Sequence, residues 1–175
     1  MLKKISLAVV VLILIVVALA AMQPDSFRVQ RAIAIKAPPE KIMPLISDFH
    51  QWPQWSPWEK LDPAMNRVFS GAPKDVGAVY AWNGNKEVGA GRMEITSMTP
   101  PNQVGIKLVF LEPFESHCVT DFALDSKGES TTVTWTMSGP SNFMTKVMGL
   151  FSSMDKMIGK DFEAGLASMK AAAEK

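Results

Sequence analysis

An almost uninterrupted run of apolar residues occupies the start of the chain. Residues 5–22 contain only one polar side chain, Ser6, and two lysines, Lys3 and Lys4, precede them. At 1.5 Å of helical rise per residue, the run spans roughly 26 Å, enough for a bilayer core when flanking lysines reach outward. Residues 1–23 are therefore predicted to be a transmembrane anchor. The alternative is a cleaved signal segment, because residues 18–20 read Ala-Leu-Ala, a small-x-small cleavage pattern.

The charges around this run indicate its orientation. Lys3, Lys4 and the terminal amine favour a cytoplasmic N-terminus, although Arg28 and Arg31 on the other side weaken that preference. We expect a single-pass membrane protein with its domain on the extracytoplasmic side. The signal-peptide alternative predicts export after cleavage.

From residue 27 the pattern changes to alternation, which predicts β-strands. Residues 27–35 place Phe27, Val29, Ile33 and Ile35 on one side, typical of a half-buried strand. A short helix follows the prolines at 38 and 39, because apolar residues then recur at helical spacing up to Phe49. Further strands are expected at residues 65–69, 77–82, 91–97, 103–111, 115–124 and 130–137. Short turns join them, so the strands are expected to form an antiparallel meander.

Residues 141–173 return to helical spacing, with an apolar side chain every three or four positions. About 30 residues is long for one globular helix, and this stretch contains Gly149, Gly159 and Gly165. Interior glycines weaken a helix unless they permit a bend or a close backbone approach. We therefore expect a break near Gly149.

The order of these elements predicts an α+β domain over residues 27–175. An antiparallel sheet of about six to seven strands has one apolar face that needs a cover. The long C-terminal helix can provide it, so the sheet is expected to wrap around that helix. The predicted N-terminal membrane helix precedes this domain.

Charge and chemistry exclude several classes of function. The formal net charge is +1, and no cluster of Lys and Arg occurs after residue 4, so nucleic acid is not expected as a partner. Cys118 is the lone cysteine, and it has no metal-ligand spacing with His50 or His117. We expect no metal, no cofactor and no disulfide, and Cys118 is interpreted as a small buried residue.

Four segments resemble the START-like, or SRPBCC, superfamily with its helix-grip fold. They are residues 33–42, the aromatic turn from Phe49 to Trp58, residues 89–95, and Val133-Thr134-Trp135. Within the superfamily, the chain looks like the polyketide cyclase/dehydrase and lipid-transport family. This resemblance covers about residues 27–172 and implies a carrier or binder of hydrophobic molecules, held between the sheet and the last helix.

The cavity implied by this fold would be lined by one face of the sheet and by the apolar stripe of the terminal helix. The chain has 12 methionines, whose flexible side chains suit a pocket for variable apolar shapes. An equally weighted alternative is that the same residues fill a solid core. The candidate ligand-binding residues are Arg31, Ile106, Leu108, Phe110, Trp135, Met137, Val147, Phe151, Met154, Ile158 and Phe162.

Two further features have competing interpretations. Trp52, Trp55 and Trp58 are candidates for the cavity mouth or a membrane-surface contact, while a small core beneath a loop is the preferred alternative. Arg31 shares a side with apolar residues, so it is either a polar handle for a ligand or a side chain whose stem covers apolar surface.

No catalytic motif is present, although isolated acidic and basic groups such as Glu59, Glu94 and Asp121 occur. We therefore expect a membrane-anchored, noncatalytic module that binds a lipid or another hydrophobic small molecule. The alternatives are a cyclase/dehydratase-type enzyme using the same cavity and a ligand-free envelope interaction protein. The sequence indicates no catalytic residue, partner protein or oligomeric state.

Overall fold

The computed structural model describes the backbone of residues 2–175, and the burial of side chains at residues 4, 6, 7 and from 9 onward. The described residues form a seven-stranded antiparallel sheet in the order β1-β7-β6-β5-β4-β3-β2. The strands are β1 (Ser26–Ile35), β2 (Asn66–Gly71), β3 (Ala78–Asn83), β4 (Ala90–Thr99), β5 (Gln103–Glu112), β6 (Ser116–Lys127) and β7 (Ser130–Pro140).

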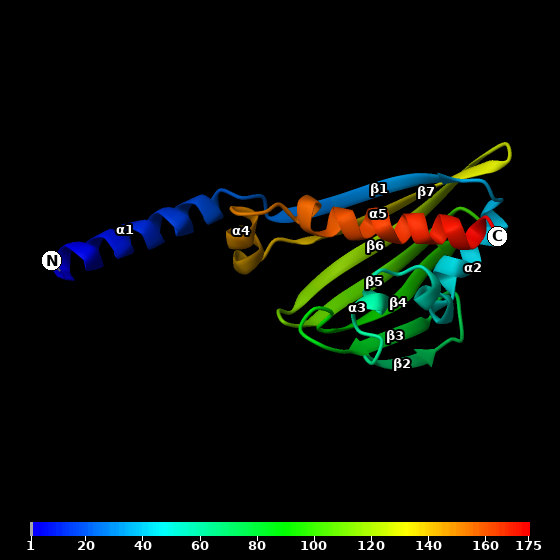
Figure 1. Ribbon diagram of the computed structural model, residues 1–175, viewed down its shortest axis with the longest axis horizontal. Coiled ribbons are helices and arrows are strands. Elements are labelled where there is room, and N and C mark those ends of the chain that lie inside the picture. Colours follow the sequence, from blue (N-terminus) through cyan, green and yellow to red (C-terminus); the bar gives the residue numbers. More distant parts are fainter. Residues whose placement is uncertain (1) are drawn as a thin grey trace.

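Helices cover one face of this sheet (Figure 1). The long helix α5 lies along β1 and β7, and a short helical layer lies near its C-terminal end. The helices are α1 (Leu2–Ala21), α2 (Pro39–Ser47), the 3-10 helix η1 (Phe49–Gln54), α3 (Trp58–Leu61), α4 (Phe143–Gly149) and α5 (Met154–Ala173). The α+β helix-grip fold predicted from the sequence is confirmed.

The C-terminal helical stretch breaks where the sequence analysis expected it. Helix α4 ends at Gly149 and α5 begins at Met154. Each helix has its own N-cap: the Asn142 side chain accepts a hydrogen bond from the Thr145 N–H at 2.8 Å, and Ser153 accepts one from Lys156 N–H at 3.3 Å. The first backbone N–H groups of α5 have no carbonyl partner within the helix, as they would have in one continuous helix. The Ser153 side chain accepts a hydrogen bond from one of them, so α5 begins there as a separate helix.

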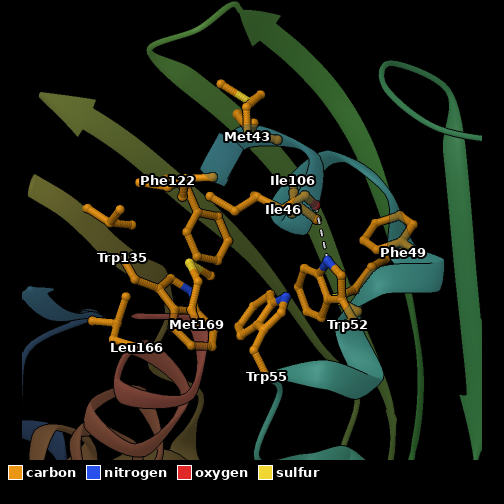
Figure 2. Packing of buried hydrophobic residues seen from close by; sticks show 14 of the residues in the cluster. Met43, Ile46, Phe49, Trp52, Trp55, Ile106, Phe122, Trp135, Leu166 and Met169 are labelled. Atoms are coloured by element: carbon orange, nitrogen blue, oxygen red, sulfur yellow. Dashed lines mark hydrogen bonds between the residues drawn. The ribbon is translucent and has the colours of Figure 1, made fainter. Parts of the chain in front are cut away.

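Helix α5 packs on the sheet through Phe162, Leu166 and Met169, each at most 1% exposed. Figure 2 shows Leu166 and Met169 beside Trp135 of β7, with Trp52 and Trp55 of the aromatic turn on the other side. Gly165 permits this approach, because a Cβ atom there would lie 2.9 Å from the Trp135 ring and 3.2 Å from Pro57. The core therefore joins α5, β7 and the aromatic turn.

The N-terminal helix α1 extends away from the sheet and contacts α4 (Figure 1). Among the residues that the structure describes, no helix combines sufficient length with sufficient apolarity to cross a membrane. This finding contradicts the predicted membrane segment at residues 5–22 and the single-pass localisation derived from it.

Candidate functional site

A cavity of about 270 Å³ lies between the sheet, α3 and α5. Seven of the residues that line it are aromatic, and four of the remaining buried ones are methionine or leucine. The aromatic residues are Trp52, Trp58, Tyr80, Trp82, Phe110, Trp135 and Phe162. The aliphatic ones include Met65, Met93, Leu108, Met137 and Ile158. Such an apolar lining with few polar groups is typical of a small-molecule site.

Trp135 is the centre of the aromatic wall. Its ring stacks on Phe162 of α5 at a centroid distance of 3.9 Å and on Phe122 of β6 at 5.0 Å. Trp58 meets the same ring edge-on at 5.8 Å. Aromatic pairs in these arrangements contribute about 0.5–1.5 kcal/mol beyond the area they bury. Trp135 Nε1 is buried and has no hydrogen-bond partner among the described residues.

A glycine allows a second ring to form the far end of the cavity. Trp82 lies over Gly91 of the neighbouring strand, where a Cβ atom would come within 2.4 Å of the indole carbons. The Trp82 N–H donates a hydrogen bond to the Val88 carbonyl at 3.0 Å, which fixes the ring orientation. Any larger residue at position 91 would displace the ring.

Glu59 of α3 is buried beside the cavity but has partners for both carboxylate oxygens. The Tyr80 hydroxyl donates to Oε1 at 2.6 Å, and Arg67 Nε donates to Oε2 at 2.8 Å. Burial first, and then the hydrogen bond to Glu59, raise the pKa of Tyr80 above its ordinary value. The hydrogen bond to Glu59 likewise raises the pKa of Arg67. This triad is charge-balanced and fastens α3 to β2 and β3.

The remaining buried polar groups of the lining have no such partners. Ser56 and Thr120 are each 3% exposed, and their hydroxyl groups form no hydrogen bond with the described residues. Asp161 of α5 is half-buried, and desolvation alone raises the pKa of its carboxyl. At the rim, Lys86, Glu87 and Glu112 are exposed.

Eight of the candidate residues from the sequence analysis line this cavity. They are Trp52, Trp58, Leu108, Phe110, Trp135, Met137, Ile158 and Phe162. The structure brings these residues together from η1, α3, the two strands β5 and β7, and α5. Their predicted role in binding a ligand remains a prediction.

The other six candidates lie elsewhere. Ile106 and Trp55 are fully buried in the core, and Met154 packs at its edge. Val147 of α4 is half-buried, whereas Phe151 after α4 is 83% exposed. The helix break turns these last two away from the sheet, so the regular spacing across residues 141–173 does not describe one continuous face.

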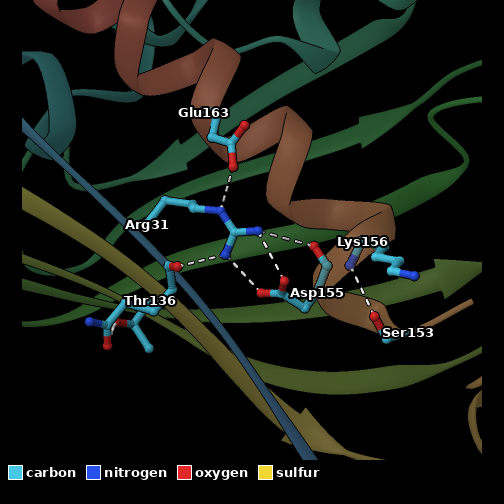
Figure 3. A network of polar contacts seen from close by, with 7 residues as sticks. Arg31, Thr136, Ser153, Asp155, Lys156 and Glu163 are labelled. Carbon is cyan, nitrogen blue, oxygen red and sulfur yellow. Dashed lines mark hydrogen bonds and ion pairs between the residues drawn. The ribbon is translucent and has the colours of Figure 1, made fainter.

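The sixth, Arg31, faces α5 outside the cavity (Figure 3). Its guanidinium donates to both carboxylate oxygens of Asp155, at 2.7 and 3.1 Å, and to Glu163 at 2.6 Å. The Arg31 hydrogen bond lowers the pKa of Asp155. The guanidinium lies over Gly159, where a Cβ atom would be 2.0 Å from it. Arg31 therefore joins β1 to α5.

Two of the three tryptophans considered for a cavity mouth are core residues. Trp52 is 3% exposed and its N–H donates to the Ile46 carbonyl at 3.0 Å, as Figure 2 shows. Trp55 is fully buried, and its N–H donates to the Leu45 carbonyl at 2.7 Å. Both indoles thereby tie the aromatic turn to α2, and Trp58 alone of the three is partly exposed.

Several lining residues were not among the candidates, and a signal existed for two of them. Asp161 lies three residues after Ile158 and four before Gly165, which places it on the same helical face. Thr120 alternates with the buried Cys118 and Phe122 on β6. Ser56 and Glu59 follow no periodicity, because they lie in and beside an irregular turn.

Cys118 is buried, and burial raises the pKa of its thiol, so the reactive thiolate is disfavoured. No group of three His, Cys, Asp or Glu side chains suited to a metal ion occurs among the described residues. The cavity is thus the feature of the described chain best suited to bind a ligand.

Comparison with known proteins supports this assignment of the fold. Protein CV1439 from Chromobacterium violaceum has 13% identity and a TM-score of 0.61, with 87% of this chain and 99% of that chain covered. The ginseng major latex-like protein 151 from Panax ginseng has 21% identity and a TM-score of 0.56, covering 86% and 97%. The Aha1 dimer from Colwellia psychrerythraea has 21% identity and a TM-score of 0.58, covering 85% and 96%. No curated protein sequence matches the chain.

These solved structures share the fold at low identity. The family model for polyketide cyclase/dehydrase and lipid transport matches residues 26–174, which is the whole domain from β1 to the end of α5. The chain belongs to the polyketide cyclase/dehydrase and lipid transport family, within the SRPBCC superfamily.

Proposed function

We propose that the chain binds one compact, mainly apolar small molecule in the cavity between the sheet and α5, without catalysing a reaction. The observation that carries this proposal is the cavity itself, about 270 Å³ in volume and lined mainly by aromatic and aliphatic side chains. Membership of the polyketide cyclase/dehydrase and lipid transport family supports it further.

The cavity volume limits the size of the molecule. Ligand sites commonly occupy about 300–1,000 Å³, so this cavity, at about 270 Å³, lies just below that range. At roughly 30 Å³ for each water-sized group, it holds about nine such groups. A ring with a short side chain fits this volume, whereas a lipid with two long acyl chains does not. The proposed ligand is therefore a compact hydrophobic metabolite.

A cyclase/dehydratase-type activity is the alternative that the family suggests, and the polar pairs in the lining argue against it. General acid–base catalysis needs a group that is free to exchange protons near neutral pH. Glu59 accepts from both Tyr80 and Arg67, and the pKa of Tyr80 is raised rather than lowered. This triad is committed to holding α3. Asp161, the other partly buried acid of the lining, forms no hydrogen bond with a described residue and so lacks a positioned partner for proton transfer, which favours binding over catalysis.

Calorimetric titration of the full chain with phenylbutanol tests the proposal. We expect one molecule bound per chain, because the cavity has room for one. Leu108→Trp places a larger side chain into the lining and should lower the affinity at least about tenfold by occupying ligand space. Native mass spectrometry of the chain purified without added ligand should detect a recurring small apolar molecule.

The matched control is Val119→Trp, which adds the same ring on the exposed face of β6, where Val119 is 50% exposed. This variant should bind phenylbutanol as the wild type does. Leu108→Phe is a smaller change and replaces Leu108→Trp as the test variant if the latter does not fold. Equal binding by the wild type and both Leu108 variants, or no binding by the wild type, would falsify the proposal.

A further inference from the structure

The cavity contains polar groups whose hydrogen-bonding capacity the chain does not use. Thr120 and Ser56 are each 3% exposed and line the cavity with hydroxyl groups that hydrogen bond to no described residue. Asp161 lines it with a half-buried carboxylate that forms neither an ion pair nor a hydrogen bond with the described residues. Buried polar groups in native proteins are normally paired. The hydroxyl groups can donate or accept, and the buried Trp135 N–H, which also lacks a partner, can only donate. The Asp161 carboxylate can only accept, so it is the group that suits a ligand carrying hydrogen-bond donors.

Acidic residues outnumber basic residues in the lining of the cavity. The ionisable residues of the lining are Glu59, Glu87, Glu112 and Asp161, with Lys86 as the basic one. Arg67 balances Glu59 at 2.8 Å. Three carboxylates then remain against one ammonium group, and none of these four groups forms an ion pair within the described part of the chain. A cationic ligand would compensate this excess, whereas an anionic one would add to it.

The aromatic side chains of the lining also favour a positively charged ligand. Faces of Trp and Tyr rings attract a cation within about 6 Å, and this attraction strengthens when water is excluded. Trp58 and Trp82 contribute such rings to the lining, whereas Trp135 stacks on Phe162 and Phe122, and Tyr80 stacks on Phe69. A protonated amine attached to an apolar body therefore matches both the rings and the unpaired carboxylate.

We propose that the cavity selects a lipophilic amine, with its protonated nitrogen at the Asp161 carboxylate and its apolar body against the aromatic wall. The hydroxyl groups of Thr120 and Ser56 accept further hydrogen bonds from the ligand. This inference rests on the proposed function and assigns the chemical class of the molecule bound.

Three probes of matched chain length test the charge preference by calorimetry on the full chain: phenylbutylamine, phenylbutanol and phenylbutyrate. We expect the amine to bind roughly tenfold more tightly than the alcohol, as for a charge-assisted hydrogen bond, and the carboxylate to bind most weakly. Asp161→Asn keeps the shape of the side chain but removes its charge. The amine and the alcohol should then bind this variant equally.

Asp121→Asn is the matched control, because Asp121 of β6 is also half-buried and does not line the cavity. It should retain the preference for the amine. Asp161→Ala is a second variant, with a residue that favours helix, in case Asp161→Asn does not fold.

The possible failures are distinguishable. If the wild type binds the alcohol as tightly as the amine, or if both Asp161 variants keep the preference, the assignment of an amine is overturned while the proposed binding function stands. If none of the three probes binds, the proposed function is overturned together with this assignment.

Discussion

Asp161 occupies a position on α5 that an apolar residue would fill in a solid core. It precedes Phe162, whose ring stacks on Trp135, and it shares a helical face with Ile158 and Gly165. No described residue compensates its charge, so its carboxyl is stabilised in the neutral form by burial. An unpaired, partly buried carboxylate costs stability in the free protein, which agrees with the proposed role of Asp161 in binding a cationic ligand.

This residue gives a prediction about stability and pH. The folded-state pKa of Asp161 is raised above its ordinary value of 3.8, so the folded state binds this proton more tightly than the unfolded state does. Stability should therefore fall as pH rises through the folded pKa. Asp161→Asn should stabilise the free protein near pH 7 by less than about 1 kcal/mol, since the group is only half-buried.

Urea unfolding of the wild type and Asp161→Asn, near pH 7 and again near pH 3, measures this effect. The difference should shrink in acid, where both states of the wild type are protonated. Lower stability of the variant near neutral pH would contradict the argument and would mean that the carboxylate has a stabilising partner.

At the scale of elements, the contact between β1 and α5 depends on one arginine and one glycine. Arg31 spans from β1 to Asp155 and Glu163, one turn before and one turn after Gly159. The missing side chain at Gly159 provides the space in which the guanidinium lies. A bend and a close backbone approach were both open for the interior glycines of this stretch; at Gly159 the group that approaches is the arginine side chain.

A double-mutant cycle between these residues tests the arrangement. In the Arg31→Ala background, Gly159→Ala should stabilise the domain by about 0.5–1 kcal/mol, because alanine favours helix more than glycine does. In the wild-type background the new Cβ atom meets the guanidinium, and the gain should be smaller or reversed. Thermal unfolding of the four proteins gives the coupling. The same effect in both backgrounds would show that Gly159 and Arg31 are independent.

Helix α3 is too short to be stable by itself. Its position depends on the hydrogen bonds among Glu59, Tyr80 and Arg67. Tyr80→Phe should cost about 1 kcal/mol, the value of one buried hydrogen bond. Because the folded pKa of Tyr80 is raised above 10.0, stability should fall as pH rises above that value, and Tyr80→Phe should remove this dependence.

Tyr80 is the one tyrosine in the chain, so ultraviolet absorption reports its ionisation directly. We expect the tyrosinate signal to appear well above pH 10 in the folded protein and near pH 10 in urea. Arg67→Lys, which keeps the charge, serves as a comparison. Ionisation near pH 10 in the folded state would be inconsistent with a buried Tyr80–Glu59 hydrogen bond.

At the scale of the whole molecule, periodicity predicted the elements better than it predicted the site. Alternation from Phe27 to Ile35 and helical spacing from Met154 to Met169 correspond to β1 and α5. These patterns report burial, and a cavity wall and a solid core are buried alike. Periodicity therefore could not distinguish Leu108, which lines the cavity, from Ile106, which fills the core two residues earlier.

Periodicity could not predict the polar contacts of Glu59 and Arg31. The partners of Glu59 come from β2 and β3, and only the folded chain places them beside α3. The direction of Arg31 was also open, because its acidic partners lie more than 120 residues away in sequence. Long-range charge pairing leaves no local pattern in a single sequence.

The position of β1 between solvent and β7 has a consequence for synthesis on the ribosome. Ser26 pairs with Pro140 and Ile35 with Thr131, so about 100 residues separate each partner from the other. At roughly 5–20 residues per second, β1 waits about 5–20 s for the strand that completes its hydrogen bonds. Contacts this distant in sequence also slow the folding search. The nascent chain must therefore keep an unpaired apolar strand from aggregating until its last quarter emerges, and a chaperone that binds β1 during that interval would raise the yield of folded protein.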